Sequence, residues 1–140
     1  SMINVAVDAM GGDNAPGEIV KGAVEAVNKR SDIHVLLVGQ EEAVKKELAS
    51  HTYPKEQITL VQASEVIETE EPPVNAIRKK KDSSIVVGMN LVKNGEADAF
   101  VSAGSSGAVL VGGAGGTHQR CGTAALWRID PDGKGCIPAA

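Results

Sequence analysis

Aromatic residues are nearly absent from this chain of 140 residues, in which phenylalanine, tyrosine and tryptophan occur once each. So few aromatic rings leave little for stacking on nucleic-acid bases, and a formal net charge of −4 does not favour a generally basic surface. Only two cysteines occur, Cys121 and Cys136, and two unclustered thiols do not make a disulfide framework or a zinc site. We therefore expect no nucleic-acid partner and no metal site.

Long apolar runs and common cofactor motifs are also missing. No run of 18 apolar residues exists and the N-terminus has no apolar signal core, so we expect a soluble, cytoplasmic protein. The Gly-Lys-Ser/Thr of a Walker A loop is absent, and no Gly-x-Gly-x-x-Gly follows the first apolar run. The sequence has no Gly-x-Ser-x-Gly either, so nucleophilic catalysis of the hydrolase type has no support.

What the chain does contain is alternating strand and helix patterns, within a length that suits one domain. Hydrophobic residues make up 42% of it, mainly Val, Ala, Leu and Ile. Apolar runs predict strands at residues 3–7, 33–38, 58–61 and 97–101, and helical spacing predicts helices at residues 18–30, 41–50, 73–77 and 85–94. This alternation predicts an α/β fold with a parallel sheet and right-handed crossovers. His34 lies inside a predicted strand, and we interpret it as structural.

The first predicted strand leads into the stretch around which the chain is organised. It ends at Asp8, and Gly11, Gly12, Asp13 and Asn14 follow before a helix begins. Ligands of open α/β sheets bind outside the carboxyl ends of the strands, and paired glycines permit positive φ and let backbone N–H groups approach an anion. The alternative is a tight turn capped by Asp13 or Asn14 with no ligand.

The strand at residues 97–101 leads into a second turn of the same kind, this time rich in serine. Its residues are Ser102, Ala103, Gly104, Ser105, Ser106 and Gly107. Hydroxyls and backbone donors at the start of a helix suit a phosphate or a carboxylate, although a structural helix cap is the alternative.

A basic run, Arg78 to Lys81, separates the two turns in the sequence and ends at Asp82, Ser83 and Ser84, which we predict to cap the next helix. A run of this kind is usually a solvated face. Because it precedes a Ser-Ser cap, it could instead gather cations and hydroxyls around an anion. On that interpretation the candidate phosphate ligands are Arg78, Lys79, Lys81, Ser83 and Ser84.

Several segments, in register over residues 2 to about 113, resemble the phosphate acyltransferases of bacterial phospholipid synthesis, the PlsX family. They are Val7–Pro16, Ala63–Ile67, Glu71–Pro73, Ile77–Ser84, Gly95–Ala99 and Val101–Ala108. The family usually has Thr where this chain has Ser106.

This resemblance implies transfer of an acyl group from acyl-[acyl-carrier-protein] to inorganic phosphate, which gives an acyl phosphate for the glycerol-3-phosphate acyltransferase. It implies a three-layer α/β/α sandwich with a mostly parallel sheet, similar to isocitrate dehydrogenase and phosphotransacetylase and here incomplete. It also implies a homodimer that touches the cytoplasmic face of the membrane, and no cofactor. Asp8, Asp13 or Asn14 could orient the phosphate or the carrier thiol, and the sequence does not separate these roles. An enzyme using acyl-coenzyme A and a non-catalytic phosphate- or nucleotide-binding domain are the alternative functions.

The resemblance ends after Gly113, so we divide the chain into an acyltransferase part, residues 1–113, and a tail, residues 114–140. Each residue of the tail can be encoded by a limited set of codons. Read in a frame shifted by one base, these codons are compatible with an amino-acid sequence that resembles the next segment of the family's proteins. We hypothesise that the tail is a frameshifted translation, expect it to be poorly ordered, and expect this chain to be inactive alone. The nucleotide sequence beyond the codon for Gly113 tests the hypothesis.

Overall fold

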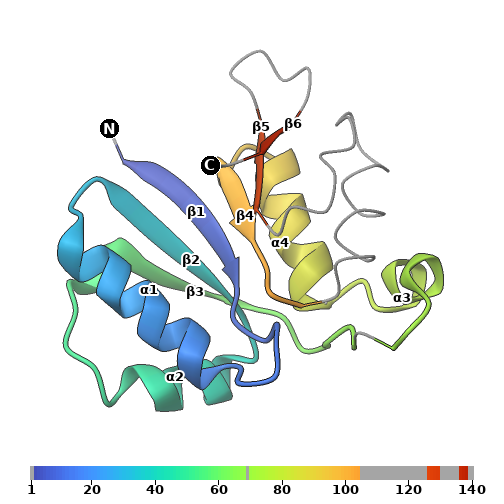
Figure 1. Cartoon of the computed structure of the whole chain (residues 1–140), viewed down its shortest axis with the longest axis horizontal. Coiled ribbons are helices and arrows are strands. Elements are labelled where there is room, and N and C mark those ends of the chain that lie inside the picture. The colour runs from blue at the N-terminus through green and yellow to red at the C-terminus, as the bar shows by residue number, and fades with distance from the viewer. Residues whose placement is uncertain (1, 69, 105–125, 130–135, 139–140) are drawn as a thin grey trace.

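The computed structural model describes residues 2–68, 70–104, 126–129 and 136–138, and within them helices lie on both faces of one sheet (Figure 1). The strands are β1 (Ile3–Asp8), β2 (Ile33–Gly39), β3 (Ile58–Gln62), β4 (Ala99–Val101), β5 (Leu126–Ile129) and β6 (Cys136–Pro138). The helices are α1 (Gly17–Lys29), α2 (Glu41–Leu48), α3 (Pro73–Lys79) and α4 (Ser84–Lys93), and a short 3-10 helix, Lys55–Gln57, precedes β3.

The sheet has the strand order β3-β2-β1-β4-β5-β6. Strands β1 to β4 run parallel, whereas β5 and β6 add to the edge of β4 in the antiparallel sense. The predicted mostly parallel sheet is therefore confirmed. Strands β5 and β6 belong to the segment predicted as a tail, most of which lies outside the described residues, so the predicted division at Gly113 and the disorder of the tail stay predictions.

One face of the sheet packs against α1 and α2. Successive side chains of a strand point to opposite faces, and the odd-numbered positions of β1 and β2 face these two helices. The buried members of this cluster from the strands and helices include Val20, Val24, Val35, Leu37 and Val44. Helix α1 buries one apolar stripe, as its spacing predicts.

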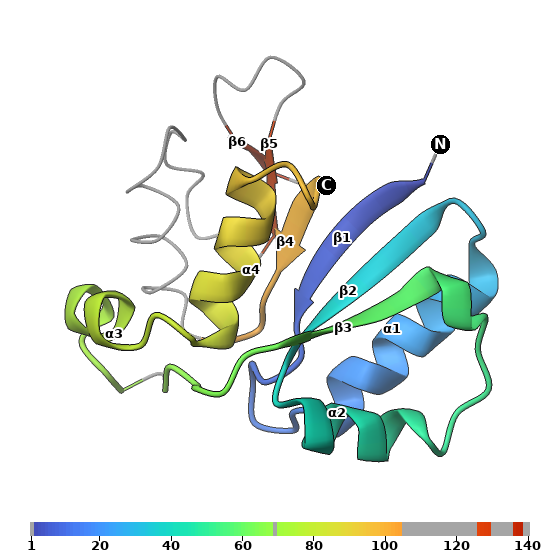
Figure 2. The same ribbon diagram turned by 180° about the vertical axis from the view of Figure 1, so that it is seen from behind.

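The opposite face packs against α4, which Figure 2 shows from behind. Its cluster joins Ala6 and Leu36 of the sheet to Ile85 of the helix and to Phe100 of β4. Phe100 is fully buried, and a β-carbon at Gly88 would overlap its ring, so Gly88 lets α4 approach β4 closely. A sheet with helices packed on both faces confirms the three-layer α/β/α prediction. The likeness to isocitrate dehydrogenase and phosphotransacetylase stays a prediction.

The predicted cap of α4 is confirmed, whereas the alternative of a cap at Asp13 or Asn14 for α1 is wrong. Ser83 caps α4 through a hydrogen bond from the Val86 N–H to its Oγ, and Gly95 follows the helix with a φ of 79°. Helix α1 instead begins after Pro16 without a capping side chain, so Asp13 and Asn14 do not cap it.

His34 serves the sheet, as expected. Its two ring nitrogens lie 3.2 Å from Asn4 Oδ1 and 2.7 Å from Thr59 Oγ1, which links β1, β2 and β3 across one face. None of the helices in the described part of the chain is both long and apolar enough to cross a membrane.

Candidate anion site at the ends of two neighbouring strands

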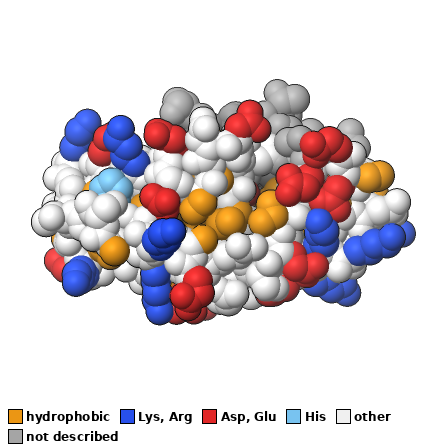
Figure 3. Space-filling view, turned by 90° about the horizontal axis from the view of Figure 1, so that it is seen from below, with side chains coloured by type: hydrophobic (Ala, Val, Ile, Leu, Met, Phe, Trp, Pro, Cys, Tyr) orange, Lys and Arg blue, Asp and Glu red, His pale blue; other side chains and the backbone are white. Residues whose placement is uncertain are grey.

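The two glycine-containing turns lie side by side because β1 and β4 are adjacent and parallel. Val7 pairs with Val101, so the residues that follow each strand emerge at the same edge of the sheet. This is the edge outside the carboxyl ends of the strands, where ligands of open α/β sheets bind. Figure 3 views the molecule from this side: apolar side chains form a central band, and acidic and basic side chains are interspersed around it. The described side chains form no continuous basic patch on this face.

A hydrogen-bond network centred on Asp8 joins the two turns. Asp8 Oδ1 accepts from the Met10 N–H at 3.0 Å, within the first turn. Asp8 Oδ2 accepts from the Ser102 hydroxyl at 2.8 Å, and Ser102 Oγ in turn accepts from the Gly104 N–H at 3.0 Å. One carboxylate therefore fixes the conformation of both turns, although Asp8 and Ser102 lie 94 residues apart.

Gly11 and Gly104 allow the backbones of the two turns to touch. A β-carbon at Gly11 would lie 2.7 Å from both Asp8 Oδ2 and Gly104 N, which is closer than real β-carbons come to such atoms. A β-carbon at Gly104 would lie 3.3 Å from Gly11 Cα and from Ser102 Oγ. Glycine is therefore required at position 11 because a β-carbon would not fit there. Of the two paired glycines, which both permit a positive φ, Gly12 alone has one, of 95°.

Asp8 is one of the few polar side chains that the fold buries, with 2% of its surface exposed. Burial raises the pKa of this carboxyl above its ordinary value of 3.8, because removal from water disfavours the charged form. Hydrogen bonds from Ser84 and Ser102, and from the backbone of Met10 and Gly11, oppose that rise by favouring the carboxylate, so the pKa is raised by less than burial alone would dictate.

Ser84 brings the N-terminus of α4 to the same carboxylate. It is buried as the first residue of the helix, and its neighbour Ser83 is the N-cap. The Ser84 N–H donates to the Glu65 carbonyl at 3.1 Å, and the Glu65 N–H donates to the Asp82 carbonyl, so the segment after β3 holds this helix start in place. Helix N-termini carry partial positive charge, which favours a nearby anion.

The first turn exposes backbone donors to the same edge. The N–H groups of Gly12, Asp13 and Asn14 have no acceptor among the residues that the structure describes. Successive N–H groups in a turn that includes a residue of positive φ can form a concave anion site. The side chains of Asp13 and Asn14 are exposed and take no part in the Asp8 network.

The basic run is divided between a structural role and an exposed one. Lys80, which we did not nominate, donates to the Val66 carbonyl at 2.7 Å and pairs with Glu71 at 2.8 Å. Arg78, Lys79 and Lys81 are exposed and form no ion pair within the described ranges. They lie on or just after α3, which projects to the side of the sheet in both ribbon views (Figures 1 and 2).

The family model described as "Fatty acid synthesis protein" matches residues 3–117, which is most of the chain. The chain belongs to this family. Among curated relatives, the protein named "Phosphate acyltransferase" of Alkaliphilus oremlandii is 53% identical over 111 residues, which are 79% of this chain and 33% of that protein.

Two further relatives carry the same name. That of Clostridium beijerinckii is 52% identical over 110 residues, 79% of this chain and 33% of its own length. That of Desulfitobacterium hafniense is 54% identical over 109 residues, 78% of this chain and 32% of its own length. The chain thus spans about one third of the length of the curated relatives that it matches.

The structure brings together five of the residues nominated from the sequence of this family member: Asp8, Gly11, Ser84, Ser102 and Gly104. Gly12 lies beside them, since a β-carbon there would be 3.5 Å from that of Ala103. Ser83 serves as the helix cap, and no hydrogen bond or ion pair among the described residues joins Arg78, Lys79 or Lys81 to the two turns. Ser105, Ser106 and Gly107 lie outside the described residues.

This arrangement suits the binding of an anion more than nucleophilic attack. Both oxygens of Asp8 accept hydrogen bonds, and the single hydroxyl proton of Ser102 is directed to Asp8. Ser102 therefore has no free proton to give a ligand while Asp8 is ionised, and backbone N–H groups are the donors that remain. In the described ranges, no three His, Cys, Asp or Glu side chains cluster as a metal would require.

Sequence reasoning expected backbone donors at the paired glycines, but it missed Lys80 and the Met10 N–H that donates to Asp8. The Met10 N–H belongs to the main chain, so its residue type does not indicate this contact. Lys80 looks like its basic neighbours in the sequence. Its one distinguishing signal is Glu71, the acid nine positions earlier to which it is joined.

Proposed function

We propose that this chain forms the first part of an enzyme that transfers an acyl group from acyl-[acyl-carrier-protein] to inorganic phosphate and so makes an acyl phosphate for phospholipid synthesis. Membership of the fatty acid synthesis protein family supports the class of reaction, and so does the name phosphate acyltransferase that the relatives carry. The chain matches about one third of those relatives, so we propose the activity for the whole enzyme and expect the 140-residue chain to be inactive alone.

The observation that carries the proposal is the Asp8 network. It fixes two turns and the start of α4 around one edge of the sheet, where backbone N–H groups and a helix N-terminus can meet a small dianion. Inorganic phosphate is a substrate of that kind, and a rigid set of donors would hold it without reorganisation during the reaction.

In the proposed reaction a phosphate oxygen attacks the thioester carbonyl carbon. The new C–O bond forms, the C–S bond breaks, and the carrier leaves as a thiolate that takes a proton from solvent. Orientation of the two substrates and stabilisation of the developing charge would supply most of the rate enhancement. In this scheme Gly12, Asp13 and Asn14 bind phosphate through their N–H groups, and Asp8 positions the turns.

The proposal extends to the partners of the full enzyme. These are the acyl carrier protein as donor, the glycerol-3-phosphate acyltransferase as the next enzyme, a second copy in a homodimer, and the cytoplasmic surface of the membrane, where the lipid product is needed. Arg78, Lys79 and Lys81 are exposed and could meet acidic partners or phosphate groups.

A chimera tests the activity. Residues 2–113 of this chain replace the matching segment of the Alkaliphilus oremlandii relative, and acyl phosphate is trapped with hydroxylamine and measured. We expect phosphate-dependent product with the acyl-carrier-protein donor, and none from the 140-residue chain alone.

Matched variants of the chimera connect the activity to the site. Gly11→Ala should abolish phosphate saturation because its β-carbon would collide with Asp8 and Gly104, whereas Gly22→Ala, which has open space around it, should leave it unchanged. A preference for acyl-coenzyme A would favour the alternative enzyme. Phosphate binding in calorimetry without any acyl transfer would overturn the proposal in favour of a binding module.

A further inference from the structure

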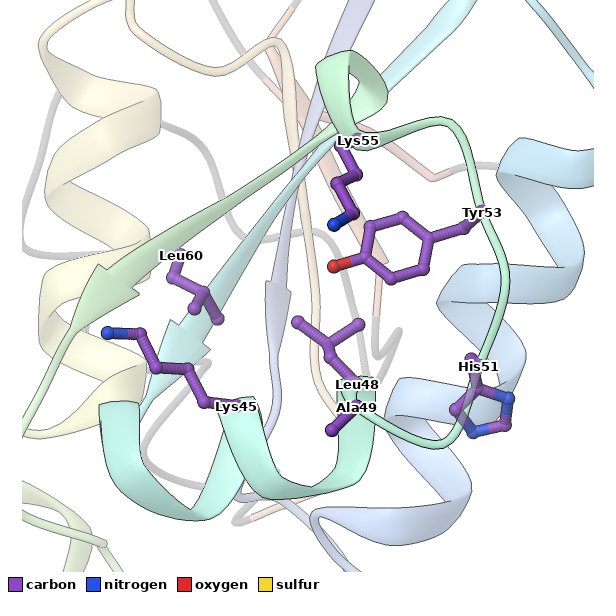
Figure 4. Close-up of a pocket in the computed structure, with 7 residues that line it drawn as sticks. All are labelled: Lys45, Leu48, Ala49, His51, Tyr53, Lys55 and Leu60. Carbon is purple, nitrogen blue, oxygen red and sulfur yellow. The ribbon is translucent and has the colours of Figure 1, made fainter.

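A cavity of about 320 Å³ lies apart from the anion site, with which it shares no lining residue. It is formed by α2, the loop that follows it and β3, and Figure 4 shows its lining. The lining residues are Lys45, Leu48, Ala49, His51, Tyr53, Lys55 and Leu60. Its volume is near the lower end of the range for small-molecule sites, which is about 300–1,000 Å³.

The lining combines an apolar floor with a polar wall. Leu48 and Leu60 form the floor, and the polar ends of Tyr53 and Lys55 both point into the cavity (Figure 4). Lys45 also lines the cavity, and its amine pairs with Glu41 at 2.7 Å. Lys55 therefore supplies the cation without an ion-pair partner among the described residues.

No acidic residue lines this cavity. The charged groups of the lining are therefore the two lysines, although the whole chain has a net charge of −4. A neutral apolar ligand would make no ionic contact with the exposed Lys55 amine, and a simple inorganic anion would not cover Leu60, which is only partly buried. Charge and apolar surface together fit a ligand that has both parts.

We propose that the cavity binds a small amphiphilic anion, in which a phosphate or carboxylate group meets Lys55 and Tyr53 and a short alkyl chain lies on Leu48 and Leu60. This site shares no residue with the turns around Asp8, and it does not depend on the proposed acyltransferase activity. An ammonium and a phenol hydroxyl both offer donors to an anionic oxygen. Each methylene that the floor removes from water raises the affinity by about three- to fourfold.

The chain's single tyrosine makes the site directly observable, because selective isotope labelling of tyrosine gives NMR signals from Tyr53 alone. The 140-residue chain is titrated with hexyl phosphate, butyl phosphate, hexanoate, hexanol and inorganic phosphate. We expect saturable shifts with hexyl phosphate and hexanoate, a Kd for butyl phosphate up to about sixteenfold weaker than for hexyl phosphate, and no saturation with hexanol or inorganic phosphate.

Two variants distinguish the loss of the Lys55 charge from a general effect of substitution on the folded protein. Lys55→Gln should weaken hexyl phosphate binding by about tenfold or more, since hydrogen bonds to charged groups are the stronger ones. Lys46→Gln, an exposed position of α2 that does not line the cavity, is the matched control and should bind as the parent does. An unchanged amide spectrum establishes that each variant is folded.

Several results would overturn the proposal. One is the absence of a saturable Tyr53 shift, meaning a Kd weaker than about 1 mM with hexyl phosphate and hexanoate alike. Equal binding of hexanol, or equal binding by Lys55→Gln, would show that the charge is not recognised. A Tyr53 signal that moves on dilution of the protein alone would make the cavity a contact between copies of the chain.

Discussion

At the scale of single residues, the burial of Asp8 costs free energy, whereas the hydrogen bonds that it accepts join the two turns. Its burial disfavours the charged form, yet its two oxygens hold together turns that come from distant parts of the chain. A buried polar group of this kind contributes little net stability but specifies one geometry when all its hydrogen bonds are made. We therefore regard Asp8 as a residue that positions the two turns, a role different from the orientation of phosphate or carrier thiol that the sequence left open for it.

The raised pKa of Asp8 predicts a pH dependence of stability. Between 3.8, the ordinary value, and the higher pKa of the folded state, the folded protein holds a proton that the unfolded chain has released. The free energy of unfolding should therefore fall as pH rises through this interval, by about 1.4 kcal/mol for each unit that separates the two pKa values. Urea unfolding of the 140-residue chain at several pH values from 4 to 7 measures it.

Asp8→Asn removes the titrating group and isolates its effect. The stability of the parent relative to this variant should be greatest at the acidic end of the series and decline toward neutral pH. A difference between the two proteins that is constant over the series, or that grows with pH, would contradict the raised pKa.

Alanine substitutions at Gly11 and Gly22 separate the effect of a steric contact from the effect of helix propensity. Gly11→Ala should lower the free energy of unfolding by about 1–3 kcal/mol, because its β-carbon overlaps Asp8 and Gly104. Gly22→Ala, on the exposed side of α1 with nothing within 4 Å, should raise it by about 0.5–1 kcal/mol because alanine favours helix. Urea unfolding measures both, and a neutral Gly11→Ala would mean that the two turns do not touch.

At the scale of elements, local patterns in the sequence predicted most of the structure. Among the described residues, the four α-helices and the four parallel strands lie within a few residues of their predicted positions, and Ser83 and Gly95 mark the ends of α4 as expected. These features depend on side chains near one another in sequence. The start of α1 was predicted to within one residue from its helical spacing, although no side chain caps it.

Alanine substitutions of the two adjacent serines at the start of α4 should lower stability with different pH dependences. Ser83→Ala removes the helix cap and should cost about 0.5–2 kcal/mol at every pH. Ser84→Ala removes a hydrogen bond that opposes the rise of the Asp8 pKa, so this pKa should rise further and the loss of stability should be larger at neutral than at acidic pH. Urea unfolding at the two pH values distinguishes them, and equal pH dependence would place Ser84 outside the Asp8 network.

At the scale of the whole molecule, the candidate site depends on strand order, which the sequence does not contain locally. Two glycine-containing strand ends could be nominated from residue types, but only the adjacency of β1 and β4 makes them one site. The basic run shows the opposite case. Its residues looked equivalent in sequence, and tertiary contacts assign Lys80 to the fold and leave Arg78, Lys79 and Lys81 exposed.

The same topology predicts how stability is distributed over the chain. Strand β2 is paired on both sides, and its last five residues are buried, so its amides should exchange only through global unfolding. Helix α3 has seven residues, of which only Ala76 is buried, and helices this short are marginal without packing, so its amides should exchange through local opening. Native-state hydrogen exchange in low concentrations of urea measures both.

Helix α1 is the control in that experiment, since it has thirteen residues and buries four side chains against the sheet. Its interior amides should exchange with a free energy and a urea dependence close to those of β2, whereas the amides of α3 should exchange with a lower free energy that is almost independent of urea. If α3 were as protected as β2, the segment that carries the basic run would be part of the cooperative core. The exposed cations would then be held in a fixed position relative to the two turns, and not on a segment that opens independently.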